Sequence, residues 1–147
     1  MLYSKTAKYA VLALAEVTRD GSDHPVPTKQ IAGAASIPYP LLAKIVGKLR
    51  MAGLIRVTRG KAGGILLARP ADRMTILDVV LALDGEAVLK DCPLYLDPCD
   101  CERVCSLHRM WGPARDAMLQ FLRSTTIQAV ADARAQADGS KAKRRRG

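Results

Sequence analysis

Aromatic residues and long apolar runs are both scarce in this sequence. Aromatic residues make up 4% of the 147 residues, with one Trp and one Phe. A core built mainly from Leu, Val, Ile and Ala suits packed helices better than a β-sandwich. Charged residues interrupt every apolar segment before it reaches the roughly 18 residues that a membrane span needs. We therefore expect a mainly α protein with no membrane partner.

The sequence also lacks targeting and catalytic motifs. Glu16 interrupts the apolar residues near the N-terminus, and no small-residue cleavage site of a signal peptide follows. We find no P-loop, no nucleotide-binding glycine fingerprint, and no Ser or Cys nucleophile with a convincing base. These absences predict a cytoplasmic protein that is not an enzyme.

The net charge of +9 is unevenly distributed along the chain. Residues 1–75 hold 12 Lys or Arg and 4 Asp or Glu, residues 76–138 hold 6 and 10, and residues 139–147 hold 5 basic residues. A basic first half is expected where one part of a protein contacts a polyanion, and nucleic acid is the natural one. A solvated basic face on a small-molecule-binding or protein-interaction module is the alternative.

Residues 1–83 have the pattern of three helices and a hairpin. Helical spacing of apolar residues and the expected N-caps Ser4 and Thr28 mark the first two helices, and Pro40 lies in the first turn of the third. The predicted helices cover 4–19, 29–34 and 40–51, and the strands 54–58 and 65–68. This order predicts a winged helix-turn-helix, whose third helix enters the major groove and whose hairpin is the wing.

The turn of the hairpin is basic and rich in glycine. Arg59 and Lys61 supply positive charge, while Gly60, Gly63 and Gly64 let the backbone approach a phosphate or the floor of the minor groove. An ordinary loose hairpin would show the same glycines. The basic third helix, with Lys44, Lys48 and Arg50 on its exposed side, favours DNA.

Three further helices are expected after the wing. Thr75 caps one that ends at Leu83, Gly112-Pro113 starts a second, and Thr126 caps a third that ends near Asp138. The second carries the apolar residues Ala117, Met118, Phe121 and Leu122. We divide the chain into a DNA-binding domain (1–83), a cysteine-rich loop (84–108), dimerisation helices (109–138) and a disordered basic tail (139–147).

Five soft ligands gather within the cysteine-rich loop: Cys92, Cys99, Cys101, Cys105 and His108. Because the cytosol disfavours disulfides, such a cluster indicates a metal or Fe–S site more often than a covalent staple. A tetrahedral zinc site and a thiol redox switch remain alternatives. The spacing lacks the paired C-x₂-C knuckles that are typical of zinc sites.

Three segments together resemble a known family. These are Ser4-Lys5-Thr6-Ala7-Lys8-Tyr9-Ala10-Val11, Arg59-Gly60-Lys61-Ala62-Gly63-Gly64 and Cys105-Ser106-Leu107-His108-Arg109-Met110-Trp111. In this order they resemble the Rrf-type winged-helix iron–sulfur regulators typified by IscR, NsrR and RirA, over residues 2 to about 135. The resemblance implies a homodimer on a palindromic double-stranded DNA operator. It also implies an iron–sulfur cluster that senses iron, redox state or nitric oxide and controls DNA affinity.

The resemblance also indicates cluster ligands. The IscR-like pattern has three Cys separated by five residues each and a His three positions later, which Cys99, Cys105 and His108 match. Cys92 lies one residue too far from Cys99, so we expect Cys92, Cys99, Cys105 and His108, with Cys101 as the alternative ligand. This set favours [2Fe–2S] over [4Fe–4S], and the imidazole is expected to raise the reduction potential. In the nitric-oxide-sensing branch a partner Asp completes a [4Fe–4S] cluster, and Lys8 stands at the matching position here.

Contacts to DNA carry over in the same way. The expected residues lie at the starts of the second and third helices, along the third helix and on the wing: Thr28, Lys29, Tyr39, Pro40, Lys44, Lys48, Arg59, Gly60 and Lys61. An aromatic beside two prolines is often half-buried packing, which is the alternative role for Tyr39. IscR-type proteins use a recognition-helix Glu to discriminate between two operator classes, and Ala43 replaces it here.

Overall fold

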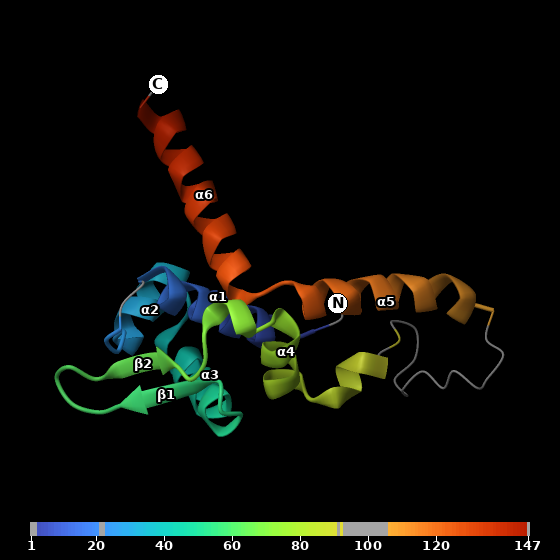
Figure 1. Cartoon of the computed structure of the whole chain (residues 1–147), viewed down its shortest axis with the longest axis horizontal. Coiled ribbons are helices and arrows are strands. Elements are labelled where there is room, and N and C mark those ends of the chain that lie inside the picture. The colour runs from blue at the N-terminus through green and yellow to red at the C-terminus, as the bar shows by residue number, and fades with distance from the viewer. Residues whose placement is uncertain (1–2, 21–22, 91, 93–105, 147) are drawn as a thin grey trace.

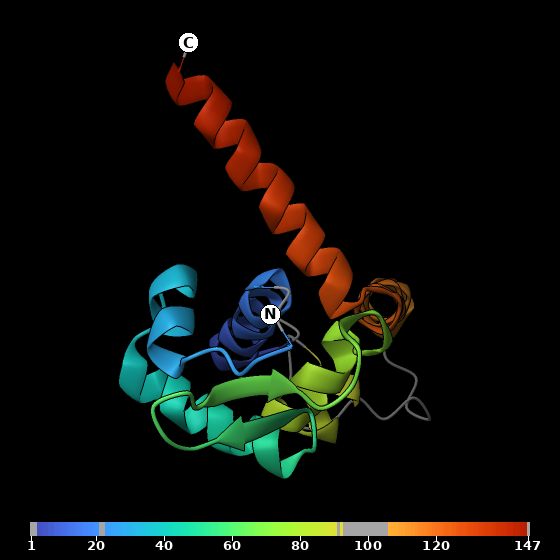
Figure 2. The same cartoon turned by 60° about the vertical axis from the view of Figure 1, so that its left-hand side comes forward.

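The computed structural model describes residues 3–20, 23–90, 92 and 106–146. Within these ranges the protein is mainly helical with one two-stranded sheet (Figures 1 and 2). The elements are α1 Lys5–Asp20, α2 Thr28–Ala35, α3 Tyr39–Met51, β1 Ile55–Thr58, β2 Gly64–Leu67, η1 Ala71–Arg73, α4 Ile76–Asp84, η2 Glu86–Lys90, α5 His108–Ser124 and α6 Ile127–Arg146. The predicted fold class, a winged helix-turn-helix followed by long C-terminal helices, is confirmed.

Helix α1 forms the centre of the core. It packs against α2, α3, α4, α6 and β2. Small side chains allow this many neighbours, since Ala7, Ala10 and Ala13 are at most 2% exposed. The helix begins as predicted, because the Ala7 amide donates a 3.0 Å hydrogen bond to the Ser4 hydroxyl.

Helices α2 and α3 form the helix-turn-helix, and the start of α2 differs from the prediction. Pro27 is the N-cap, and its carbonyl accepts the Ile31 amide at 3.2 Å. Thr28 is therefore the first helical residue rather than the cap, and no side chain caps this helix. The difference arises because Pro27 is held in an extended conformation that already leads into the helix. After α2, Ser36 turns the chain in the left-handed region and buried Ile37 fixes the turn.

The hairpin pairs β1 with β2 from Ile55 opposite Leu67 to Thr58 opposite Gly64. The segment before α2 joins its edge, because Val26 and Ile65 exchange two backbone hydrogen bonds of 2.9 and 2.8 Å. A Cβ on Gly64 would overlap the Val26 carbonyl. This glycine is thus required by packing within the domain.

The start of α5 also differs from the prediction. The helix begins at His108, and Pro113 lies inside it. The amide that proline lacks would have bonded to the Arg109 carbonyl, so only one helical hydrogen bond is lost. Gly112 does not break the helix but makes room for the ring of His108, which lies 3.3 Å from where a Cβ would stand.

Helix α6 continues past its predicted end near Asp138. Residues 139–146, expected to be disordered, continue the helix to Arg146. Ala, Lys and Arg have high helix propensity, which offsets the cost of Gly139 and Ser140. In both views α6 projects away from the rest of the chain (Figures 1 and 2). None of the helices in the described ranges is long and apolar enough to cross a membrane.

Helix α4 begins at the N-cap that the sequence predicts, Thr75. Thr28, which does not cap α2, allows a matched test of how much the Thr75 cap stabilises the fold. The Asp78 amide donates to the Thr75 hydroxyl at 3.2 Å, and the Asp78 carboxylate accepts the Thr75 amide at 2.8 Å. We expect Thr75→Ala to lower the free energy of unfolding by about 1 kcal/mol. The control Thr28→Ala should change it by less than about 0.5 kcal/mol. Urea unfolding followed by circular dichroism measures both, and equal losses would contradict the assignment of the caps.

Candidate nucleic-acid interface and cysteine region

A long stretch without acidic residues forms the helix-turn-helix and the wing. Residues 24–71 hold eight Lys or Arg and no Asp or Glu. All eight are exposed: Lys29, Lys44, Lys48, Arg50, Arg56, Arg59, Lys61 and Arg69. These elements pack on one another, since α2 contacts α3 and α3 contacts β1. These eight exposed side chains form a basic surface that no acidic residue of the same stretch offsets.

The starts of α2 and α3 are accessible to a ligand. Lys29 is exposed and Thr28 is half-buried in the first turn of α2. Tyr39 and Pro40 open α3, and Tyr39 is 48% exposed, which fits both its predicted contact with DNA and its alternative role as half-buried packing. The first amides of a helix attract phosphate, because they lack partners within the helix.

Lys44 and Lys48 lie one turn apart on α3 but differ in their partners. The ammonium of Lys48 donates to the carbonyl oxygen of Leu83 at 3.0 Å, at the end of α4. A cation there satisfies one of the last carbonyls of the helix and interacts favourably with its dipole. Lys48 therefore joins α3 to α4, a structural role that its sequence position did not indicate.

The turn of the wing exposes its basic residues. Arg59, Gly60 and Lys61 are all exposed in the turn between β1 and β2. Gly60 has a φ of +103°, which favours glycine, and the Gly63 amide donates to the Gly60 carbonyl at 3.0 Å. A Cβ on Gly63 would clash with the backbone of residues 58–60, so this glycine closes the turn, whereas Gly60 faces outward.

Two further basic residues belong to this surface and were missing from the predicted contacts. Arg50 in the last turn of α3 and Arg56 in β1 are both exposed. The absence of acidic residues between positions 24 and 71 is the sequence signal that marks them. Arg69 is engaged differently, in an ion pair of 2.8 Å with Asp78.

Only part of the cysteine region lies within the described residues. Cys92 is half-buried with a free thiol, and His108 is half-buried at the first position of α5. Cys99, Cys101 and Cys105 lie outside the described residues. In the described ranges no three His, Cys, Asp or Glu side chains are grouped as metal ligands. The sulfur of a half-buried cysteine and an imidazole given room by Gly112 are nevertheless donors that suit iron.

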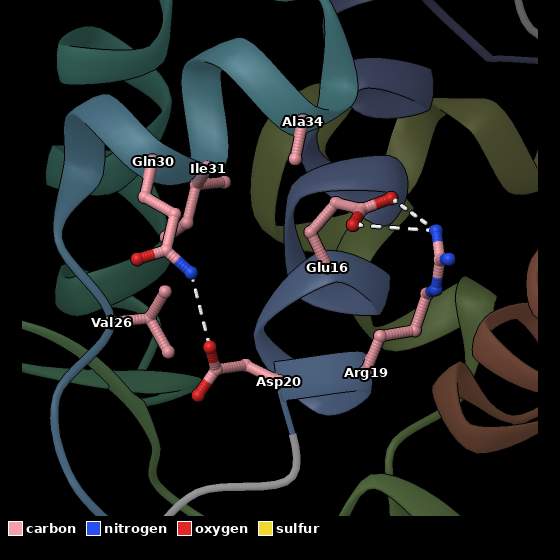
Figure 3. A pocket seen from close by; sticks show the side chains of 7 residues that line it. All are labelled: Glu16, Arg19, Asp20, Val26, Gln30, Ile31 and Ala34. Carbon is pink, nitrogen blue, oxygen red and sulfur yellow. Dashed lines mark hydrogen bonds and ion pairs between the residues drawn. The ribbon is translucent and has the colours of Figure 1, made fainter.

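A pocket of about 230 Å³ lies between α1 and α2 (Figure 3). Its polar groups bond mainly to one another: the Gln30 amide donates to Asp20 at 3.0 Å, and Arg19 pairs with Glu16 at 3.1 Å. The remaining lining is apolar, from Val26, Ile31 and Ala34. Because these polar groups already bond within the protein, we assign the pocket no ligand.

Comparison with known proteins identifies the family. Residues 3–133 match the family model Rrf2, described as an iron-dependent transcriptional regulator. The transcriptional repressor NsrR of Streptomyces coelicolor is 32% identical over 111 residues, which cover 76% of this chain and 74% of that protein.

Solved structures agree on the fold. CymR, the global cysteine regulator of B. subtilis, superposes with a TM-score of 0.75 at 26% identity, covering 88% of this chain and 95% of that one. IscR of T. potens, at 24% identity, superposes with a TM-score of 0.71 over 91% and 88% of the two chains. With its winged helix and the basic, acid-free stretch of residues 24–71, this chain belongs to the Rrf2 family of transcriptional regulators, which bind DNA and are not enzymes.

Proposed function

We propose that this regulator binds a palindromic operator as a homodimer and that an iron–sulfur cluster controls its affinity. The basic, acid-free surface of residues 24–71 carries the DNA-binding part of this proposal. The cysteine and histidine residues that precede or begin α5 carry the sensory part.

The operator contacts are assigned from exposure and charge. Helix α3 enters the major groove with Tyr39, Pro40 and Lys44 facing the DNA, and the wing brings Arg59, Gly60 and Lys61 to the backbone or the minor groove. The first turn of α2, with Thr28 and Lys29, meets a phosphate. Lys48 contributes through its bond to Leu83, by holding α3 in place.

The two lysines of α3 allow a paired test. We expect Lys44→Gln and Arg59→Gln each to reduce the slope of log K against log salt by about two per dimer, since each removes one phosphate contact per protomer. Lys48→Gln should leave the slope nearly unchanged and lower the melting temperature instead. The measurement is a salt titration on a duplex that the wild-type protein selects from a random-sequence pool. An equal loss of slope in Lys48→Gln would show that this side chain leaves Leu83 to bind phosphate.

An exposed apolar row on α5 supports the homodimer. The inward row contains Gly112, Arg115, Leu119 and Leu122. The outward row lies on a different face of the helix, where Met110 is 78% exposed, Met118 39% and Phe121 57%. Ala114, also exposed, continues this spacing of three to four residues. Such a row on a long helix fits a second copy of itself in an isologous contact.

A charge in this row should prevent dimerisation. We expect Phe121→Glu to give a monomer with unchanged helix content, because two such carboxylates would be buried in the same apolar contact. The matched control is Gln120→Glu, which places the same charge on the neighbouring exposed position. Light scattering after size exclusion measures the mass. A dimeric Phe121→Glu protein would place the interface elsewhere.

The cluster ligands in this proposal are Cys92, Cys99, Cys105 and His108, with Cys101 as the alternative. Three thiolates and one imidazole favour [2Fe–2S], and the bound cluster would supply one-electron redox chemistry and sensitivity to nitric oxide or iron supply. Two of these four residues lie in the described part of the chain, Cys92 after η2 and His108 at the first position of α5. Binding at both would fix the start of α5 relative to the end of η2.

A chain of contacts connects the start of α5 with the recognition helix. The far end of α5 bonds to the start of α4, where the Ile76 amide donates to the Thr125 carbonyl at 2.9 Å. The end of α4 holds Lys48 of α3 through Leu83. We expect cluster loss to reorient α5 and so change the spacing of the two recognition helices, which must match two half-sites.

A regulator without iron is the alternative, and the likeness to CymR favours it. That protein is described as a global cysteine regulator, and it superposes on this chain with a TM-score of 0.75. A thiol switch needs only two neighbouring cysteines, and zinc takes the same ligands. Metal analysis and the effect of reductant alone on DNA binding distinguish these readings from an iron–sulfur sensor.

Anaerobic spectroscopy with iron and sulfide analysis tests the ligand set. We expect brown wild-type protein with about two irons per chain, whereas about four would indicate the cubane cluster. Cys99→Ser and Cys105→Ser should lose the visible absorption, while the control Cys101→Ser should keep it. Colourless wild-type protein that reconstitution cannot load would favour the iron-free alternative and leave the DNA-binding assignment unaffected.

A further inference from the structure

The last turns of α6 concentrate positive charge beyond the residues that the family model matches. Residues 141–146 hold five Lys or Arg, and no acidic residue follows Asp138. The match to the family model ends at residue 133, before this segment. Its backbone is helical to Arg146, which makes it a continuation of α6.

The base of α6 is fixed on α1 by ion pairs. Arg134 contacts the same Glu16 oxygen through Nη2 at 2.8 Å and Nε at 3.0 Å. Four residues further along α6, Asp138 pairs with Arg19 at 2.9 Å. The Glu16 side chain is only 10% exposed, so this contact is largely shielded from water and salt. The direction of α6 is therefore set as far as Asp138.

Beyond Asp138 the helix leaves the body of the protein. Residues 139–141 are exposed. In both views α6 rises on the side of α1 away from α3 and the hairpin (Figures 1 and 2). The whole helix rises about 30 Å, which far exceeds a Debye length of about 8 Å at physiological salt. Charges at its end add little to the binding of DNA on α3 and the wing.

We propose that the basic end of α6 binds a second DNA duplex, so that one dimer joins two DNA segments. This rests on the proposed operator binding of the dimer. Residues 139–146 contain no aromatic residue and nothing apolar larger than Ala. They lack the stacking groups used on single-stranded RNA and the apolar anchors used on proteins. The groups that remain are the Lys and Arg side chains, and these suit duplex phosphates, which they bind without regard to sequence.

A tail variant separates this site from the operator surface. The variant replaces Lys141, Lys143, Arg144, Arg145 and Arg146 with Gln and keeps the chain length. The control replaces Arg59 and Lys61 with Gln. Each full-length protein is placed on an immobilised operator duplex selected from a random-sequence pool, and capture of a fluorescent 30-base-pair duplex of mixed sequence is then measured.

We expect the tail variant to bind the operator with unchanged affinity and salt slope but to lose capture of the second duplex. Wild-type capture should weaken by about two to three orders of magnitude between 50 and 200 mM salt, as about five phosphate contacts predict. The control should lose operator affinity yet still bind the mixed-sequence duplex in solution through α6. That result also separates a failed operator assignment from a failed tail assignment.

Three results would overturn the proposal. Unchanged capture by the tail variant would show that another surface holds the second duplex. A lower salt slope of the tail variant on the operator would place the tail on the same DNA. Single-stranded RNA that displaces the fluorescent duplex more strongly than unlabelled duplex does would assign the segment to RNA.

Discussion

Two backbone hydrogen bonds at the junction of α5 and α6 hold the C-terminal helices to the DNA-binding domain. The Ile76 amide donates to the Thr125 carbonyl at 2.9 Å, and the Ile127 amide donates to the Met74 carbonyl at 2.8 Å. Met74 and Ile127 are fully buried, so breaking the pair would leave polar groups without water. Helices α5 and α6 diverge from this point (Figure 1), and beyond it the ion pairs of Arg134 and Asp138 with α1 set the direction of α6.

Helix α4 carries this constraint to the rest of the domain. Its first end combines the capping box of Thr75 with the bridge between Thr75 and Thr126. Its last end receives hydrogen bonds from Lys48 of α3, to the Leu83 carbonyl, and from both the amide and the hydroxyl of Ser4, to the Asp84 carboxylate at 2.7 and 2.5 Å. With only nine residues, α4 connects the α5–α6 junction to both the central helix and the recognition helix.

The sequence predicts what depends on neighbouring residues and misses what depends on distant ones. The cap of Thr75, the hairpin and the exposed basic side of α3 follow from local spacing, and all three are confirmed. Pro113 inside α5 and the continuation of α6 contradict local rules that favour breaks at Pro and Gly. Lys48 illustrates the same limit at the site, since only the packing of α3 against α4 shows that its ammonium faces a carbonyl. The cluster ligands stay predictions, because Cys99 and Cys105 lie outside the described residues.

The proposed sensor lies at the end of α5 that is farthest from the junction with α6, so a small displacement there acts over the whole length of the helix. His108 opens α5, and its 17 residues extend about 25 Å to the junction with α6. A signal shifts an equilibrium only by the difference in its affinity for two arrangements, so the ligand must bind one orientation of α5 better than another. An iron–sulfur cluster and a thiol switch before or at the start of α5 would both meet this condition through the same helix. In the proposed mechanism the same helix therefore carries either signal towards α3, whichever group the cysteines and His108 hold.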